Sequence, residues 1–203
     1  MNGMEAIVFD LGNVLIAVDE PKAAERMAAR TGKTRQQIDE YARSTPYVIE
    51  LALGRITKNV FFHTVAKDLG FDGDYDEFAR IWSEIFTPIE PMIALAESLK
   101  TRLPRLLLSN TNAIHMDYVF AHFPFLKDFD AQVLSHEVGM LKPDAAIYRL
   151  TLEKYGLAAE RTVFIDDLVA NVEGARRVGM QAIHFQGPDQ TRAELTKLGI
   201  SPI

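Results

Sequence analysis

Acidic and other polar side chains follow three short apolar runs of this sequence. They are Asp10, the pair Ser109 and Asn110, and the pair Asp166 and Asp167. Short apolar runs are typical of strands buried in a parallel sheet. Because the carboxyl ends of parallel strands meet at one edge of a sheet, we expect these side chains to lie close together.

The three acids in this group indicate a bound cation. Backbone amides and helix N-termini at such an edge attract anions, whereas carboxylates repel an anion unless a cation lies between them. Oxygen ligands with no histidine or cysteine nearby in the sequence favour Mg²⁺. A metal ion beside a nucleophilic carboxylate is an arrangement suited to phosphoryl transfer.

Lys142 is the fourth candidate. It precedes Pro143, which we expect in the first turn of a helix that ends at Gly156. A lysine at such a junction can hold a phosphate and keep a carboxylate nucleophile in its charged form.

Asn171 follows Asp167 by four residues, so it either orients the acids or satisfies backbone groups.

Strands and helices alternate over the second part of the chain. Strands are expected at 106–108, 131–134, 162–165 and 181–185, with helices between them, and a first strand at 6–9. This alternation predicts βαβ units with right-handed crossovers. The predicted fold class is therefore α/β, a Rossmann-like parallel sheet with helices on both faces.

The segment from 18 to 87 has a different character. Alanines, charges and helical spacing dominate it, and no convincing strand appears between Asp19 and Thr87. We predict a core formed by residues 1–17 and 88–203 and an inserted α-helical cap formed by residues 18–87. The proline-containing stretch 87–91 is the expected hinge.

Four motifs in chain order resemble those of the haloacid dehalogenase (HAD)-like hydrolase superfamily. They are FDLGNVL at 9–15, LSNTN at 108–112, GMLKPD at 139–144 and FIDD at 164–167. The resemblance covers nearly the whole chain, because the insert is similar to the helical cap of one subgroup. The chain also resembles bacterial sugar-phosphate phosphatases of the glucose-1-phosphate type.

The resemblance implies a metal-dependent nucleophile. Asp10 would attack phosphorus, form an aspartyl-phosphate and also bind Mg²⁺. The backbone carbonyl of Gly12 and the side chain of Asp166 would be further ligands. Asp167 would bind the metal directly or through water.

The resemblance also implies a phosphate site. Ser109, the backbone amide of Asn110 and Lys142 would hold the phosphoryl oxygens. The expected reaction is Mg²⁺-dependent phosphomonoester hydrolysis. The expected substrate is a small phosphorylated metabolite such as a sugar phosphate.

Gly12 departs from the family pattern. Most phosphatases of the superfamily carry a second Asp two positions after the nucleophile as general acid and base. A water molecule, Asp19 or a cap residue such as Glu50 are the open alternatives. An ester with a good leaving group, such as a sugar 1-phosphate, needs less protonation.

Two other functions remain open from the sequence. A 2-haloacid dehalogenase would attack carbon with the same Asp and would need no metal, so the acid pair argues against it. A non-catalytic HAD-fold binding protein is suggested by Gly12, while the retained Asp10 and Lys142 argue against it.

Composition excludes several classes of protein. The chain has 22 Lys and Arg, 28 Asp and Glu, a net charge of −6 and no cysteine. Disulfide frameworks and thiolate chemistry are thereby excluded, and we predict a cytoplasmic location. The acidic balance argues against a nucleic-acid partner, and the apolar runs are far shorter than a membrane span of about 20 residues. We see no signal peptide, and the oligomeric state is left open.

Overall fold

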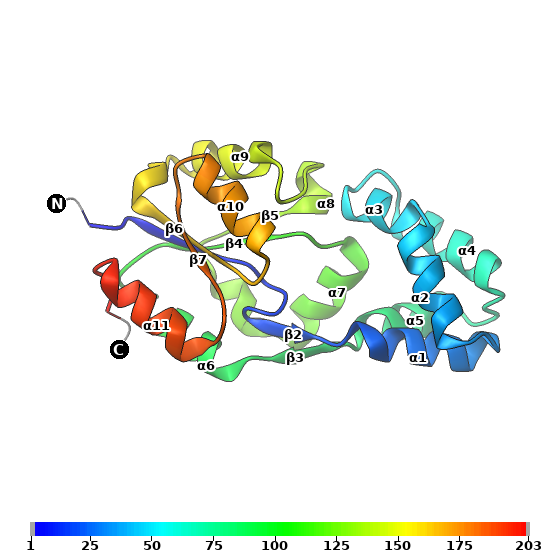
Figure 1. Cartoon of the computed structure of the whole chain (residues 1–203). Helices are drawn as coiled ribbons and strands as arrows, with labels where there is room; N and C mark the ends of the chain where they lie inside the picture. The colour runs from blue at the N-terminus through cyan, green and yellow to red at the C-terminus, as the bar shows by residue number, and fades with distance from the viewer. Residues whose placement is uncertain (1–2, 202–203) are drawn as a thin grey trace.

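A five-stranded parallel sheet forms the centre of the molecule (Figure 1). The computed structural model describes residues 3–201. The sheet has the order β5-β4-β1-β6-β7. Its strands are β1 (Ala6–Phe9), β4 (Arg105–Ser109), β5 (Ala131–Leu134), β6 (Thr162–Asp166) and β7 (Gln181–His184). All four neighbouring pairs are parallel, which confirms the predicted α/β class.

Helices cover both faces of this sheet (Figure 1). On one face lie α6 (Glu90–Ser98), α7 (Ala113–His122) and α11 (Pro188–Lys197). On the other lie α9 (Ala145–Tyr155) and α10 (Val169–Arg177). The period of two along β1 divides its side chains between these layers. Ile7 and Phe9 pack with the first group of helices, and Ala6 and Val8 pack with the second.

A two-stranded antiparallel ribbon leads from the sheet to a group of five helices (Figure 1). Its strands are β2 (Ile16–Val18) and β3 (Phe86–Pro88), with Ala17 opposite Thr87. The helices between them are α1 (Glu20–Thr31), α2 (Arg35–Ser44), α3 (Tyr47–Ala52), α4 (Lys58–Leu69) and α5 (Tyr75–Ser83). Several helices were expected here. The expectation of no strand between Asp19 and Thr87 was wrong at its end, because β3 begins at Phe86. No sequence signal indicated β3, since it is only three residues long and includes Pro88.

The start of α9 also differs from the prediction. Pro143 does not lie in its first turn, because the helix begins at Ala145. The side chain of Asp144 accepts a hydrogen bond from the backbone N–H of Ala146 at 3.0 Å and caps the helix. Gly156 ends it as predicted, in the left-handed conformation with φ 64°. The remaining short helices are α8 (Ser135–Val138) and the 3₁₀ turns Pro124–Asp128 and Ala159–Arg161.

Helices α1 to α5 share their own apolar cluster, to which α7 contributes Ile114. His115, the next residue, joins α7 to α5, since its Nε2 lies 3.2 Å from the carbonyl oxygen of Trp82. Its Nδ1 lies 3.1 Å from the carboxamide nitrogen of Asn112.

Among residues 3–201, no helix combines the length and apolar character that a membrane crossing requires.

His115 is expected to make the protein sensitive to acid. Burial lowers its pKa from 6.5 to about 4. The neutral ring therefore contributes stability above pH 6.5, and this contribution is lost as the pH falls toward 4. As the pH falls from 7 to 4, we expect the unfolding free energy of His115→Gln to fall by about 3 kcal/mol less than that of the wild type. Urea unfolding measures this, with exposed His63→Gln as control. Equal losses in all three proteins would contradict the prediction.

Candidate functional site

The carboxyl ends of the three central strands bring the predicted acids together. Asp10 directly follows β1, and Asp166 ends the neighbouring strand β6. Carboxylate oxygens of Asp10, Asp166 and Asp167 all lie within 4.8 Å of one another. Ser109 ends β4 on the other side of β1 and is buried. The parallel register therefore assembles the acidic group that the sequence predicted.

Lys142 lies between two of these acids. Its Nζ is 2.7 Å from Asp10 Oδ1 and 2.7 Å from Asp166 Oδ2. All three side chains are buried. A buried ion is stable only when it is paired and hydrogen-bonded, so this ammonium and the two carboxylates depend on one another.

Asn110 secures the loop that carries Lys142. Its carboxamide nitrogen donates to the carbonyl oxygen of Lys142 at 2.9 Å, and its Oδ1 accepts from the backbone N–H of Lys142 at 2.8 Å. The side chain thus pairs with the backbone as a peptide group would. The sequence had assigned Asn110 only a backbone role at the phosphate. Nothing in the sequence indicated this second role, because its partner is 32 residues away.

Asn171 orients Asp166. Its Nδ2 lies 3.0 Å from each carboxylate oxygen of Asp166, and the backbone N–H of Leu168 donates to Oδ1 at 2.8 Å. Of the two alternatives left open for Asn171, the structure therefore supports orientation of the acids. Four polar contacts, including Lys142, hold this fully buried carboxylate in one position.

Asn13 is a site residue that the sequence reasoning missed. Its Nδ2 donates to Asp167 Oδ2 at 3.3 Å, and its Oδ1 accepts from the backbone N–H of Val18 at 3.1 Å. Its φ of 55° is in the left-handed region, which asparagine tolerates better than most residues. The Gly12-Asn13 turn signal was visible in the sequence, but it did not indicate where the carboxamide would point.

The acids carry more negative charge than Lys142 neutralises. Burial raises the pKa of Asp10 to about 7, and the nearby charge of Asp166 adds to this increase, although Lys142 lowers it. Burial and Asp166 also raise the pKa of Asp167. Lys142 was expected to keep the nucleophile charged, and it lowers the Asp10 pKa in that direction. A second cation therefore fits the site, and the hard oxygen donors of three carboxylates suit Mg²⁺.

Gly12 has little room for a side chain. A Cβ added there would lie 3.3 Å from Cγ2 of Val18. The two sequence candidates for a replacement acid have other partners. Asp19 caps α1 by accepting from the backbone N–H of Lys22, and Glu50 pairs with Arg55 at 3.1 Å. The identity of the proton donor stays a prediction.

Comparisons with known proteins match nearly the whole chain. The haloacid dehalogenase-like hydrolase family model matches residues 4–179. The D-ribitol-5-phosphate phosphatase of Bacteroides thetaiotaomicron is 25% identical over 200 residues, which cover 94% of this chain and 96% of that protein. The drimenol cyclase drtB of Aspergillus calidoustus is 27% identical over 98% of this chain, but the chain spans only 37% of its length.

A solved structure is similar to the complete fold. It is a HAD family enzyme from Bacteroides thetaiotaomicron in complex with magnesium and inorganic phosphate. It superposes with a TM-score of 0.82 at 27% identity, over 89% of this chain and 93% of that chain.

Proposed function

The chain belongs to the haloacid dehalogenase-like hydrolase family, and we propose that it is a Mg²⁺-dependent phosphomonoester hydrolase that forms an aspartyl-phosphate on Asp10. The observation that carries this proposal is the buried pairing of Asp10 with Lys142, inside a group of three carboxylates. The similar enzyme solved with magnesium and phosphate supports the choice of metal and substrate class.

Asp10, Asp166 and Asp167 would hold the metal, together with the backbone carbonyl of Gly12 that the resemblance implies. Their oxygens form a hard donor set, and their charge exceeds what Lys142 offsets. When bound, Mg²⁺ supplies positive charge that stabilises the phosphoryl group.

The residues of the chain would perform two displacements. In the first, an Asp10 oxygen bonds to phosphorus, the ester P–O bond breaks, and the alkoxide leaves with the bonding electron pair and takes a proton to become the alcohol. In the second, a water oxygen bonds to the same phosphorus and gives up a proton, the P–O bond to Asp10 breaks, and inorganic phosphate and the Asp10 carboxylate are released. Ser109, the amide of Asn110 and the ammonium of Lys142 would hold the phosphoryl oxygens in both steps.

Residues 18–87 would act as a cap on a core formed by 1–17 and 88–203. The separate apolar cluster of α1 to α5 and the two chain crossings at β2 and β3 support this division. Closure of the cap would exclude bulk water from the site, and the cap would contact the leaving group. The substrate would be a small phosphorylated metabolite, with a sugar phosphate as the expectation from the family resemblance.

The metal requirement is tested with p-nitrophenyl phosphate, whose leaving group needs no proton. We expect hydrolysis with Mg²⁺, loss of hydrolysis in EDTA and recovery when excess Mg²⁺ is restored. Full activity in EDTA would contradict the metal role. Halide release from a 2-haloacid without phosphate release would favour a dehalogenase. Neither activity would favour a binding protein.

A further inference from the structure

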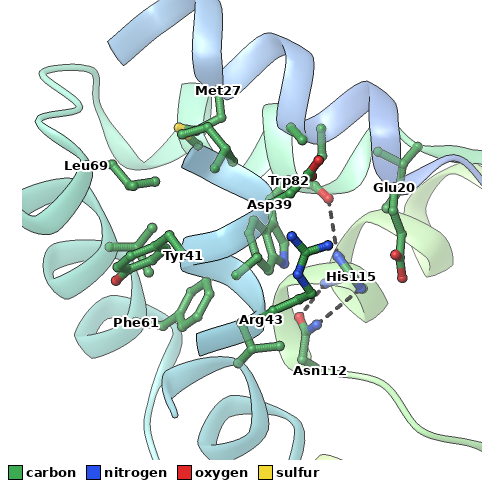
Figure 2. A pocket seen from close by; sticks show the side chains of 17 residues that line it. Glu20, Met27, Asp39, Tyr41, Arg43, Phe61, Leu69, Trp82, Asn112 and His115 are labelled. Atoms are coloured by element: carbon green, nitrogen blue, oxygen red, sulfur yellow. Dashed lines mark hydrogen bonds between the residues drawn. The ribbon is translucent and has the colours of Figure 1, made fainter. Parts of the chain in front are cut away.

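A cavity of about 400 Å³ lies among helices α1, α2, α4 and α5 and the first turn of α7 (Figure 2). Protein interiors contain few voids larger than a water molecule. Ligand pockets, in contrast, measure about 300 to 1,000 Å³. The cavity is therefore large enough to receive part of a small molecule.

The cavity walls are mainly apolar. They are lined by Met27, Ile38, Phe61, Val65, Leu69 and Trp82, among others. Of its charged lining residues, Glu20 and Arg43 are exposed, and Asp39 pairs with Arg35 at 3.5 Å. The three charged lining residues all come from α1 and α2, whereas α4, α5 and α7 contribute none.

The wall formed by α7 carries no charge. Both ring nitrogens of His115 have partners, Asn112 and the carbonyl of Trp82, and burial lowers the pKa of His115 to about 4, so the ring is neutral at pH 7. The indole Nε1 of Trp82 is buried and has no hydrogen-bond partner among residues 3–201. This wall and Trp82 therefore offer one spare donor, the indole N–H, and otherwise apolar or already paired groups, while the charged lining residues belong to α1 and α2.

The cavity adjoins both chain segments that carry the catalytic groups. Asn112 lines it two residues after Asn110, which holds the backbone of Lys142. Glu20 lines it two residues after Val18, which packs against Gly12. The alcohol part of an ester whose phosphate lies at Asp10 would therefore extend toward this cavity.

We infer that the cavity receives the alcohol part of the substrate, and that this part is apolar, an aryl group or an alkyl chain. The inference rests on the proposed phosphatase function, and it replaces the expectation of a sugar phosphate with an apolar phosphate ester. A polyhydroxylated sugar would leave hydroxyl groups unpaired against these walls, each at a desolvation penalty, whereas alkyl and aryl groups carry none.

A series of n-alkyl phosphates from ethyl to decyl tests the inference. We expect kcat/KM to rise about fourfold per methylene until the cavity is filled, because each buried methylene gains about 0.8 kcal/mol. Sugar phosphates of comparable size should lack this gain. Hydrolysis that does not depend on chain length, or that favours sugar phosphates, would overturn the inference and leave the proposed function intact.

Binding is measured separately from turnover. Trp82 is the only tryptophan of the chain and lines the cavity, so its fluorescence reports occupancy. We expect decyl phosphate to shift the emission at lower concentration than ethyl phosphate does. If no ester is hydrolysed but this order of affinity holds, the apolar site stands and the proposed function fails. Equal affinity for both phosphates would overturn the site itself.

Two alanines of α1 provide matched variants. Ala24 is buried and lines the cavity, whereas Ala29 is exposed and does not. Ala24→Leu should lower the decyl-to-ethyl ratio of kcat/KM by about tenfold or more, because its added carbons occupy the site of several methylenes. Ala29→Leu should leave the ratio unchanged. Ala23→Leu, on the same wall but less buried, provides the test if Ala24→Leu does not fold. An unchanged ratio in a folded cavity variant would contradict the inference.

Discussion

Replacing Asp10 with asparagine is expected to lower phosphatase activity by about 10⁴-fold or more, while the protein stays folded. A carboxamide of the same shape cannot attack phosphorus or form an aspartyl-phosphate. Burial raises the pKa of Asp10 to about 7, above the 3.8 of an exposed carboxyl. The unfolding free energy therefore falls as the pH rises from 3.8 to 7, and the full loss is present above pH 7. Asn removes that charge, and Lys142 keeps its contact with Asp166. We therefore expect the metal-free variant to be at least as stable as the wild type at pH 8.

Rates of p-nitrophenyl phosphate hydrolysis with Mg²⁺ and thermal unfolding measure the two effects. Acid quenching with labelled substrate separates a nucleophile from a mere metal ligand, since only the wild type should retain label on the protein. Asp144→Asn is the matched control, because asparagine also caps helices well and Asp144 lies outside the acidic group. Substantial activity in Asp10→Asn would refute the proposed nucleophile.

Lys142→Met should lose activity and about 3 to 5 kcal/mol of unfolding free energy in the metal-free protein. Among residues 3–201, Lys142 is the only cation paired with Asp10 and Asp166, so the substitution leaves two buried carboxylates facing each other. Mg²⁺ should restore part of the stability, because an ion that binds only the folded state stabilises it. Urea unfolding with and without Mg²⁺ measures both effects. The exposed Lys154→Met is the control.

A double substitution shows whether repulsion between the acids causes this loss. Lys142→Met combined with Asp10→Asn removes one of the two opposed charges. We expect the double variant to be more stable than Lys142→Met alone, which is a coupling between residues in contact. Additive losses would mean that Lys142 contributes through packing, and the electrostatic account of the site would be wrong.

The sequence predicted the sheet and the position of the acids because both depend on local patterns. Apolar runs marked the strands, and the residue after each run marked the edge where Asp10 and Asp166 meet. The ribbon of β2 and β3 was missed because three-residue strands have no recognisable period. Their pairing also could not be read from a local pattern, because Ile16 pairs with Pro88, which lies far from it in the sequence.

Two of the three supporting carboxamides, Asn13 and Asn110, were missed for a different reason. Asn13, Asn110 and Asn171 all hold a catalytic candidate or its loop, but their partners lie at other places in the fold. Asparagine in a loop is ordinary, and its hydrogen-bond partner depends on the tertiary arrangement. Only the spacing of Asn171 from the acid pair suggested such a role. The start of α9 was misplaced because the cap at Asp144 outweighed the helix-start signal of Pro143.

The central position of β1 has a consequence for how the protein is made. β1 leaves the ribosome before the other strands of the sheet, and both strands that flank it come much later, at Arg105–Ser109 and Thr162–Asp166. During synthesis, β1 and the Asp10 that follows it therefore have no neighbouring strands until β4 and β6 have emerged. Its buried site forms only when the last of its acids has been added. Nascent chains that end before residue 167 should thus lack phosphatase activity, so that catalysis begins only after β6 and Asp167 have been synthesised.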